Sequence, residues 1–440
     1  MQRQKCKRFI RWIPEKKEKG MVFKMCKRML SILVGVILLF ALVGCSSSST
    51  NGKTSSKNNE LKMVFWDSNQ EKGLKAMADS FMKKNPDYKV TVETIPWEQY
   101  WTKLQAAAQG GNMPDIVVMH PDEVSKYAEG GKLMDLKDMF TKSKITSLES
   151  FPQFVVDDFS FDGKVYGVPK DIGTMALAYN KDLFDQAGVA YPNDNWTWAD
   201  MLSAAEKITN KSKDVYGIVA PNDGQNFYWN LVWQNDGDFF AKDGKTSTFN
   251  SPENIEAMKY VVSFIEKGYT PTVADFANLS QDEYFEAGKA GMIFAGSWML
   301  PEYLAIKGLN FDIAQLPQGK KRAAISSGMA FSVSKDSKNP KAALKLVEFL
   351  GSEEAQLIQS KSGVAISAYK NTQQPWIDGF TTIDTTPFAK VIDYGHTSPG
   401  ITTNNEASAV IDKYMPEIFS LKMPVKEGLK KITDEINALK

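Results

Sequence analysis

After residue 60, short apolar runs alternate along the chain with amphipathic stretches of helical period. Leu61–Asp67 predicts a buried strand, and Gly73–Asn85 carries apolar residues at helical spacing. Val90–Ile95 alternates as a second strand, and Asp115–Met119 predicts a third. This strand–helix–strand order is typical of an α/β fold.

The stretch from Gly163 to Gly188 has a different character. Val165–Val168 and Met175–Tyr179 read as strands, with Lys170 and Asp171 between them beside a glycine. A charged pair is a poor core segment, so we expect the chain to cross between two lobes here. Asn180 should cap a helix over Lys181–Ala187 that Gly188 ends.

Length and charge narrow the class of protein. A chain of 440 residues favours two domains, because single cores stop growing near 250–300 residues. The net charge of +1 hides a basic N-terminus, since residues 1–44 hold 11 Lys/Arg and two acids. The rest has a formal charge of −8, the wrong sign for a nucleic-acid binder. Arg322 is its only arginine, which disfavours an anionic ligand.

The N-terminus predicts export. Met29–Val43 is a 15-residue apolar run behind basic residues, shorter than the roughly 20 residues of a membrane span. We therefore expect residues 1–44 to be a signal peptide, with Met21 or Met25 as alternative start sites to Met1. Leu42–Cys45 resembles a bacterial lipobox, which predicts lipid on Cys45; an ordinary buried cysteine is the alternative. The polar residues 45–60 predict a flexible tether.

Five motifs in order resemble the extracellular solute-binding proteins of ABC importers, in the group that includes the maltose-binding type. The central one is GKVYGVP followed by YNKDLF and AG, within residues 163–188. The others are PDIVV with its following aspartate and AEGGKLMDL, then WTWAD, FEAGKAGMIFAGSW, and SKDSKNPKAALKLVEFL. Together they cover most of the chain after Glu60.

The resemblance implies a two-lobe periplasmic-binding-protein-like fold of type II, with a ligand cleft between the lobes. We expect an N-lobe of 61–171 plus 313–365 and a C-lobe of 172–312 plus 366–440. It further implies a monomer without cofactor or metal, which closes on its ligand and delivers it to membrane permeases. Such a lipoprotein would be anchored on the outer face of the cell membrane of a Gram-positive bacterium.

Polar and aromatic residues follow the predicted strands of the N-lobe, where ligands bind in open α/β sheets. Trp66 and Asp67 end the first strand, and the resemblance implies that this loop contacts the ligand. Core filling by Trp66 and helix capping by Asp67 are the alternatives. Asp122 takes the position at which the family often places a sugar-hydroxyl acceptor, or else it caps the helix Glu123–Glu129. His120 has no clustered partner that would indicate a metal site.

The C-lobe adds a second set. Four aromatics lie within residues 227–233, where the family has stacking aromatics; we favour Trp229 and Asn230, then Phe227, and expect Trp233 to be buried. Ser297 and Trp298 follow a strand that ends in glycine, with a buried, strand-capping tryptophan as the alternative. The family also uses the main chain at the position of Gly328. His396 and Asn405 stay unassigned. The candidate ligand-binding residues are Trp66, Asp67, Asp122, Lys170, Asp171, Trp229, Asn230, Ser297, Trp298 and Gly328.

Flat aromatics and acidic hydrogen-bonding groups suit a sugar, with its apolar ring faces and hydroxyls. The number of aromatics favours a disaccharide or longer. A non-sugar solute such as a glycerol phosphate or polyamine is the alternative, and the scarcity of arginine counts against phosphates. A glycoside hydrolase would need two carboxylates about 5–10 Å apart, and no such pairing can be read here. G-x-S-x-G, H-E-x-x-H and P-loop patterns are absent, so we expect no catalytic residues.

Overall fold

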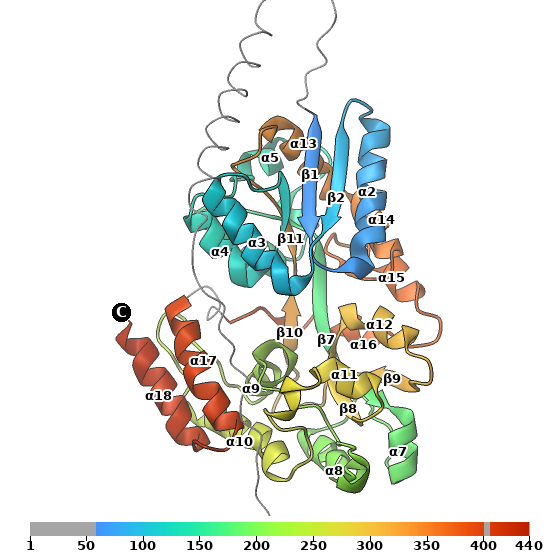
Figure 1. Cartoon of the computed structure of the whole chain (residues 1–440), viewed down its shortest axis with the longest axis vertical. Coiled ribbons are helices and arrows are strands. Elements are labelled where there is room, and N and C mark those ends of the chain that lie inside the picture. Colours follow the sequence, from blue (N-terminus) through green and yellow to red (C-terminus); the bar gives the residue numbers. More distant parts are fainter. Residues whose placement is uncertain (1–58, 400–404, 440) are drawn as a thin grey trace, which may run out of the picture. The chain divides into compact units, whose positions relative to one another are not determined.

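Five strands form the first sheet of the computed structural model, which describes residues 59–399 and 405–439 (Figure 1). The sheet order is β2-β1-β3-β11-β6, in which β2 and β3 run parallel to β1, and β11 runs antiparallel to both β3 and β6. The predicted strand–helix–strand start is confirmed. The strands are β1 (Glu60–Phe65), β2 (Lys89–Thr94), β3 (Ile116–Met119), β6 (Val168–Pro169) and β11 (Ala330–Val333).

The helices of this half bury one apolar face against the sheet, as their helical period predicts. In α2, for example, Leu74, Met77 and Phe81 are all buried. The helices are α2 (Glu71–Lys84), α3 (Trp97–Gly110), α4 (Pro121–Glu129), α5 (Lys137–Lys142), α6 (Gln153–Asp158), α13 (Pro340–Leu350) and α14 (Glu353–Lys361). A small hairpin, β4 (Ser160–Phe161) and β5 (Lys164–Val165), precedes β6.

The second sheet is built around β7 (Asp171–Asn180), which pairs antiparallel with four other strands. Nearly all of β7 is buried, as expected of a central strand that reads as a continuous apolar run. Its partners are β8 (Met292–Gly296), β9 (Phe311–Ala314), β10 (Ala324–Ser327) and β12 (Ile366–Ser367), and β13 (Gly395–His396) pairs with β10.

Helices of the second half include the C-terminal pair α17 and α18, which pack on α10 (Figure 1). The C-terminal part of the chain is therefore two helices with a break between them. The helices are α7 (Lys181–Ala187), α8 (Trp198–Ile208), α9 (Trp229–Gln234), α10 (Pro252–Glu266), α11 (Gln281–Glu286), α12 (Leu300–Ala305), α15 (Gln374–Asp378), α16 (Thr386–Val391), α17 (Asn405–Phe419) and α18 (Val425–Ala438).

The chain passes between the two sheets three times. It leaves the first sheet at β6 and enters the second at β7 through Lys170 alone. It returns between β10 and β11 through Gly328 and Met329, and it crosses again between α14, which packs on α2, and β12, which pairs with β7. The expected crossing at Lys170–Asp171 is thus where the first sheet gives way to the second.

One expectation needs correction, because Val165 and Val168 lie in two different strands, β5 and β6. Residues 324–333 form two strands, β10 and β11, because Gly328 packs against the backbone of β7: a Cβ there would lie 2.5 Å from the Asp171 carbonyl oxygen. Both β9 and β10 belong to the second sheet.

The helix signals predicted at Asn180 and Gly188 are confirmed. The Asn180 side chain accepts a hydrogen bond from Leu183 N at 3.1 Å at the start of α7, and Gly188 ends that helix in the left-handed conformation. Thr197 caps α8 in a capping box with Asp200. These signals depend on residues within one turn, which is why the sequence reveals them.

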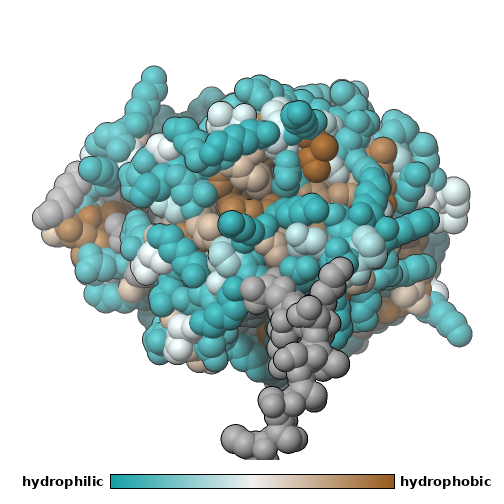
Figure 2. Space-filling view, turned by 90° about the horizontal axis from the view of Figure 1, so that it is seen from above, coloured by the Kyte–Doolittle hydropathy of each residue, from teal (hydrophilic) through white to brown (hydrophobic). Residues whose placement is uncertain are grey.

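The face shown in Figure 2 is mainly hydrophilic, with small hydrophobic areas between polar side chains. Of the helices within the described residues, none is both long and apolar enough to cross a membrane. The expected signal peptide, Cys45 and nearly all of the tether lie outside the described residues.

Candidate functional site

A cavity of about 910 Å³ is lined by residues from both sheets and from α17. The first half contributes the ends of β1 and β3 and the start of α3. The second half contributes the segment before α9, the start of α11, and the turn that follows β8. Strand ends therefore position this site, as the α/β pattern predicts.

Aromatic rings form one wall. Trp66, directly after β1, contacts Trp97 and Trp101 of α3, with ring centroids 5.2 and 5.7 Å apart. Tyr100 is fully buried behind Trp66 and donates a hydrogen bond to the Val118 carbonyl at 2.8 Å. Trp97 is 46% exposed at the edge of this cluster, which leaves an indole available to a ligand.

Two further indoles come from the second half. Trp298 follows β8 and is packed over the backbone of Gly296, where a Cβ would lie 2.3 Å from the indole. The indole of Trp298 therefore fills the space beside the backbone of this glycine. Trp229, at the start of α9, is buried and also lines the cavity.

The polar lining is acidic, and none of the described lining residues is a lysine or an arginine. Burial raises the pKa of Asp223, although hydrogen bonds from Asn226 partly offset the shift. Burial also raises the pKa of Asp282, whose hydrogen bond from Tyr303 opposes the effect. The lining acids are Asp67, Glu98, Asp122, Glu123, Asp171, Asp223, Asp282 and Asp412.

Three buried acceptors of the lining have no hydrogen-bond partner within the described part of the chain. One of them, Oε2 of Glu123, lies 3.6 Å from Lys126 Nζ in an ion pair. The other two are Oδ1 of Asp122 and Oγ of Ser327. Buried polar atoms are rarely left unpaired in native structures. Both atoms are therefore available to hydroxyl or amine donors of a ligand.

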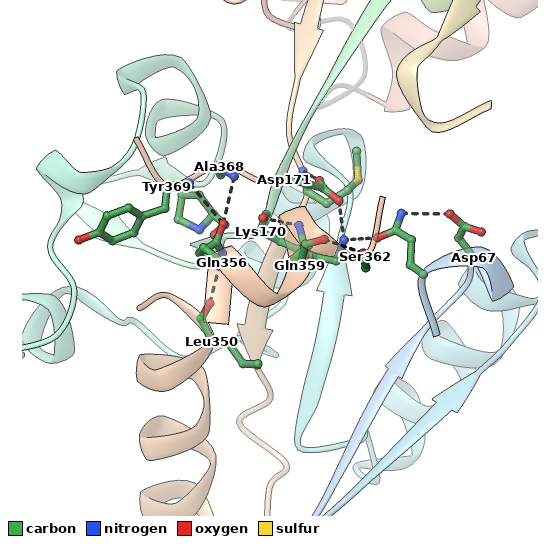
Figure 3. A network of polar contacts seen from close by, with 12 residues as sticks. Asp67, Lys170, Asp171, Leu350, Gln356, Gln359, Ser362, Ala368 and Tyr369 are labelled. Atoms are coloured by element: carbon green, nitrogen blue, oxygen red, sulfur yellow. Dashed lines mark hydrogen bonds and ion pairs between the residues drawn. The ribbon is translucent and has the colours of Figure 1, made fainter. Parts of the chain in front are cut away.

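The structure brings seven of the ten candidates to the cavity, namely Trp66, Asp67, Asp122, Asp171, Trp229, Ser297 and Trp298. Lys170 is fully buried in an ion pair with Asp171 (Figure 3). Asn230 is also fully buried and accepts a hydrogen bond from Ile325 N at 2.7 Å, so it ties α9 to β10. Gly328 lies against β7, while its neighbours Ser327 and Met329 line the cavity.

Helix capping, the alternative role for two of the candidates, holds for Asp67 and not for Asp122. Asp67 accepts a hydrogen bond from Asn69 N at 2.9 Å, so it caps a short 3₁₀ turn, Ser68–Gln70, as well as lining the cavity. Asp122 does not cap α4, because His120 is the N-cap and accepts from Asp122 N at 3.3 Å.

The remaining candidates lie in the second half. Phe227 and Trp233 are buried, as expected for Trp233. His396 stacks on Trp233 with ring centroids 4.9 Å apart and is not among the lining residues, and the side chain of Asn405 lies outside the described residues.

Sequence reasoning missed several lining residues: Gln70, Trp97, Trp101, Asp223, Tyr228 and Asp282. Trp97 and Trp101 are spaced four apart, which places them on one helix face and was a readable signal. Asp223 and Asp282 had no such signal, because Asp223 caps a short helical turn and Asp282 lies in the first turn of α11, where acidic residues are common. In the described residues, no group of three or more His, Cys, Asp or Glu could hold a metal ion.

A family comparison identifies the group to which this architecture corresponds. Residues 67–357 match the family described as bacterial extracellular solute-binding protein. The chain belongs to this family. Members are non-enzymatic transport components, so the solute-binding protein described here is not an enzyme.

Relatives are similar over most of their length. The arabinooligosaccharide-binding protein of Bacillus subtilis is 29% identical over 342 residues, which is 73% of this chain and 76% of the relative. The maltodextrin-binding protein of the same organism is 28% identical over 340 residues, 74% of this chain and 77% of the relative.

Solved structures show the same fold. An ABC substrate-binding protein from Listeria monocytogenes, in complex with cycloalternan, is 29% identical and has a TM-score of 0.80. The match covers 87% of this chain and 99% of that protein. This solute-binding protein therefore has the α/β periplasmic binding protein fold, with two mixed sheets.

Proposed function

We propose that this solute-binding protein is the sugar-binding component of an ABC importer and takes a di- or oligosaccharide into the cavity between its two sheets. The observation that carries the proposal is the lining itself. Indole faces come from both halves of the chain, and carboxylates lie around them without a lysine or arginine among the described lining residues.

The chemistry of a sugar matches this lining. A pyranose ring has an apolar face that stacks on an indole and a rim of hydroxyls that donate to carboxylates. The unpaired Oδ1 of Asp122 is such an acceptor. A volume of about 910 Å³ lies toward the upper end of the range for small-molecule pockets, which fits more than one sugar unit.

The relatives support the same ligand class. The names of the Bacillus subtilis relatives specify arabinooligosaccharide and maltodextrin, and the Listeria monocytogenes structure holds cycloalternan. These names differ in the sugar while agreeing on an oligosaccharide. We therefore propose the class and leave the individual sugar to experiment.

Closure of two lobes about the three crossings is the proposed mechanism. Because β10 pairs in the second sheet and β11 in the first, we propose that the chain returns to the first lobe at Gly328–Met329 rather than near residue 313. Binding in the cavity would hold the lobes together, and the permease would recognise the closed monomer.

A lipid on Cys45 would hold the exported chain at the outer face of the cell membrane of a Gram-positive bacterium. The lipobox-like Leu42–Cys45 supports this anchor. Labelling cells with radioactive palmitate tests it: label in the native protein, and none in Cys45→Ser, is expected. Equal label in both would rule out this anchor.

A polyamine is the second candidate ligand, because eight acids line the cavity without a lysine or arginine among the described lining residues. Amines would pair with these carboxylates. The same charges repel a glycerol phosphate, which makes that ligand a poor fit. Sugar is favoured over polyamine because the indoles offer faces for stacking on both sides.

Tryptophan fluorescence of a soluble chain beginning at Ser46 tests the proposal. The panel is glucose, maltose, maltotetraose, arabinotriose, galactobiose, spermidine and glycerol 3-phosphate. We expect saturable binding of an oligosaccharide that weakens at least about tenfold in Trp298→Ala, roughly 1.4 kcal/mol. Leu304→Ala, exposed on α12 and outside the lining, is the control and should bind as the native chain does. Binding of spermidine alone would replace sugar with polyamine.

A further inference from the structure

The three crossings between the sheets converge on Lys170 and Asp171 (Figure 3). In the first crossing, Lys170 N donates to the Met329 carbonyl of the second crossing at 2.8 Å, and Met329 N donates back to Asp171 Oδ1 at 3.0 Å. The third crossing joins them, because Gln359 Nε2 and Ala368 N donate to the Lys170 carbonyl at 2.8 and 3.4 Å.

The Lys170 ammonium extends this junction to the cavity. It is fully buried and contacts two oxygens, Asp171 Oδ2 and Gln70 Oε1. Gln70 in turn donates from Nε2 to Asp67 Oδ2 at 3.0 Å. Asp67, Gln70 and Asp171 all line the cavity, whereas Lys170 does not.

Both oxygens of Asp171 are engaged, one with the ammonium and the other with the second crossing. A buried charge must keep its partners, because removing one leaves the other uncompensated. Rotation of one sheet against the other moves the crossings, so it has to preserve or rearrange these contacts. A ligand that forms hydrogen bonds with Asp67, Gln70 or Asp171 competes with their contacts to one another and to Lys170.

We propose that Lys170 is a positioning residue that couples ligand contact at Asp67, Gln70 and Asp171 to the arrangement of the three crossings. The inference rests on the proposed function, namely that a carbohydrate binds in this cavity. Loss of the ammonium should shift the ligand-free equilibrium between lobe arrangements and weaken binding, although Lys170 touches no ligand. Couplings of this kind are typically worth about 5- to 150-fold in affinity.

A purely structural role for Lys170 predicts something different. In that case a substitution would lower the stability of the whole chain, while folded molecules kept the native lobe arrangement and affinity. Gln70 offers a second route to the same question. It lies between Asp67 and Lys170, and Gln70→Leu leaves the buried ion pair intact.

The experiment compares Lys170→Met, Gln70→Leu, their double variant and Gln374→Leu in the soluble chain beginning at Ser46. Gln374→Leu is the matched control, because it removes an exposed glutamine hydrogen bond to Asp378 on α15 and none of the contacts of Lys170 or Asp171. Spin labels on Lys103→Cys in α3 and Lys259→Cys in α10 report the distance between lobes. Both sites are exposed, and no other cysteine remains after residue 45.

We expect Lys170→Met and Gln70→Leu each to change the ligand-free distance distribution and to weaken maltotetraose or arabinotriose binding about tenfold. The double variant should lose little more affinity than either single variant. Both substitutions break the same chain of contacts, from Asp67 through Gln70 to Lys170, which we call the relay. Gln374→Leu should keep the native distribution and affinity.

The proposed coupling would be overturned if folded Lys170→Met and Gln70→Leu kept the native distribution of distances between the lobes. Losses of affinity that simply add in the double variant would also overturn it. If Lys170→Met fails to fold, Gln70→Leu alone decides. If the native chain binds no sugar, the proposed function fails instead, while the ligand-free distances still test the relay.

Discussion

Trp97 shows how one exposed side chain can extend a binding site beyond its buried part. Its indole is 46% exposed and stands against Trp66 and Trp101, so it forms the outer edge of the aromatic wall. An indole held in this way loses little freedom when a sugar ring stacks on it. Trp97 should therefore affect the affinity for long sugars more than the affinity for short ones.

We predict that Trp97→Ala weakens binding of a tetrasaccharide by about tenfold and leaves a disaccharide of the same sugar within about twofold. Calorimetric titration of maltose and maltotetraose, or of the matching arabinose pair, measures both affinities. Leu304→Ala again serves as the exposed apolar control. Equal losses of affinity for short and long sugars would show that Trp97 does not stack on the outer units of a long sugar.

Asp158 is a residue at which pH should control stability. Its Oδ2 is buried and has no hydrogen-bond partner in the described residues, and burial, with Asp122 and Asp157 nearby, raises the pKa to about 8 from 3.8. The folded chain then keeps the proton over a range in which the unfolded chain has lost it. The contribution to folding is full below pH 3.8 and is lost as the pH rises toward 8.

Asp158→Asn should therefore stabilise the chain at pH 8 by about a few kcal/mol and flatten the fall in stability between pH 4 and pH 8. Urea unfolding at a series of pH values measures the effect. Asp87→Asn, at an exposed position that is not among the groups acting on Asp158, should follow the native pH profile closely. An unchanged slope in Asp158→Asn would mean that this carboxyl is ionised in the folded chain.

Elements were predictable where their signals are local. The caps at Asn180 and Thr197 and the first strands follow from spacing and chemistry within a few residues. The break at Gly328 could not be read, because it depends on the approach of β7, far away in the sequence. Asn230 was predicted to lie in the cleft for a similar reason. A π-helical turn, Gly224–Tyr228, precedes α9, so regular helical spacing did not indicate which way Asn230 faces. In the structure its side chain accepts a hydrogen bond from the backbone of β10.

The capping box of α8 gives a prediction at this scale. Thr197→Ala removes the acceptor for Asp200 N and should lower the free energy of unfolding by about 1 kcal/mol, with no change in ligand affinity. Thermal and urea unfolding measure the change in the free energy of unfolding, and ligand titration measures the affinity. Thr102→Ala, exposed within α3, is the control. A large loss of affinity in Thr197→Ala would mean that α8 influences the cavity.

At the scale of the whole molecule, the sequence predicted an α/β chain of two lobes, and seven of its ten candidate residues line the cavity. Those seven lie at strand ends, helix starts or the first crossing, and they carry family motifs or conspicuous aromatics. The remaining part of the lining, such as Asp223 and Asp282, comes together only when distant segments assemble. The role of Lys170 emerged only from its burial among the crossings.

The most direct test of the account is a crystal structure of the soluble chain grown with the panel sugar that it binds. We predict sugar rings stacked on Trp298 and on the Trp66–Trp97 wall, with hydroxyls donating to Asp122 and its neighbouring acids. Sugar bound outside this cavity, or a polyamine within it in place of sugar, would contradict the account.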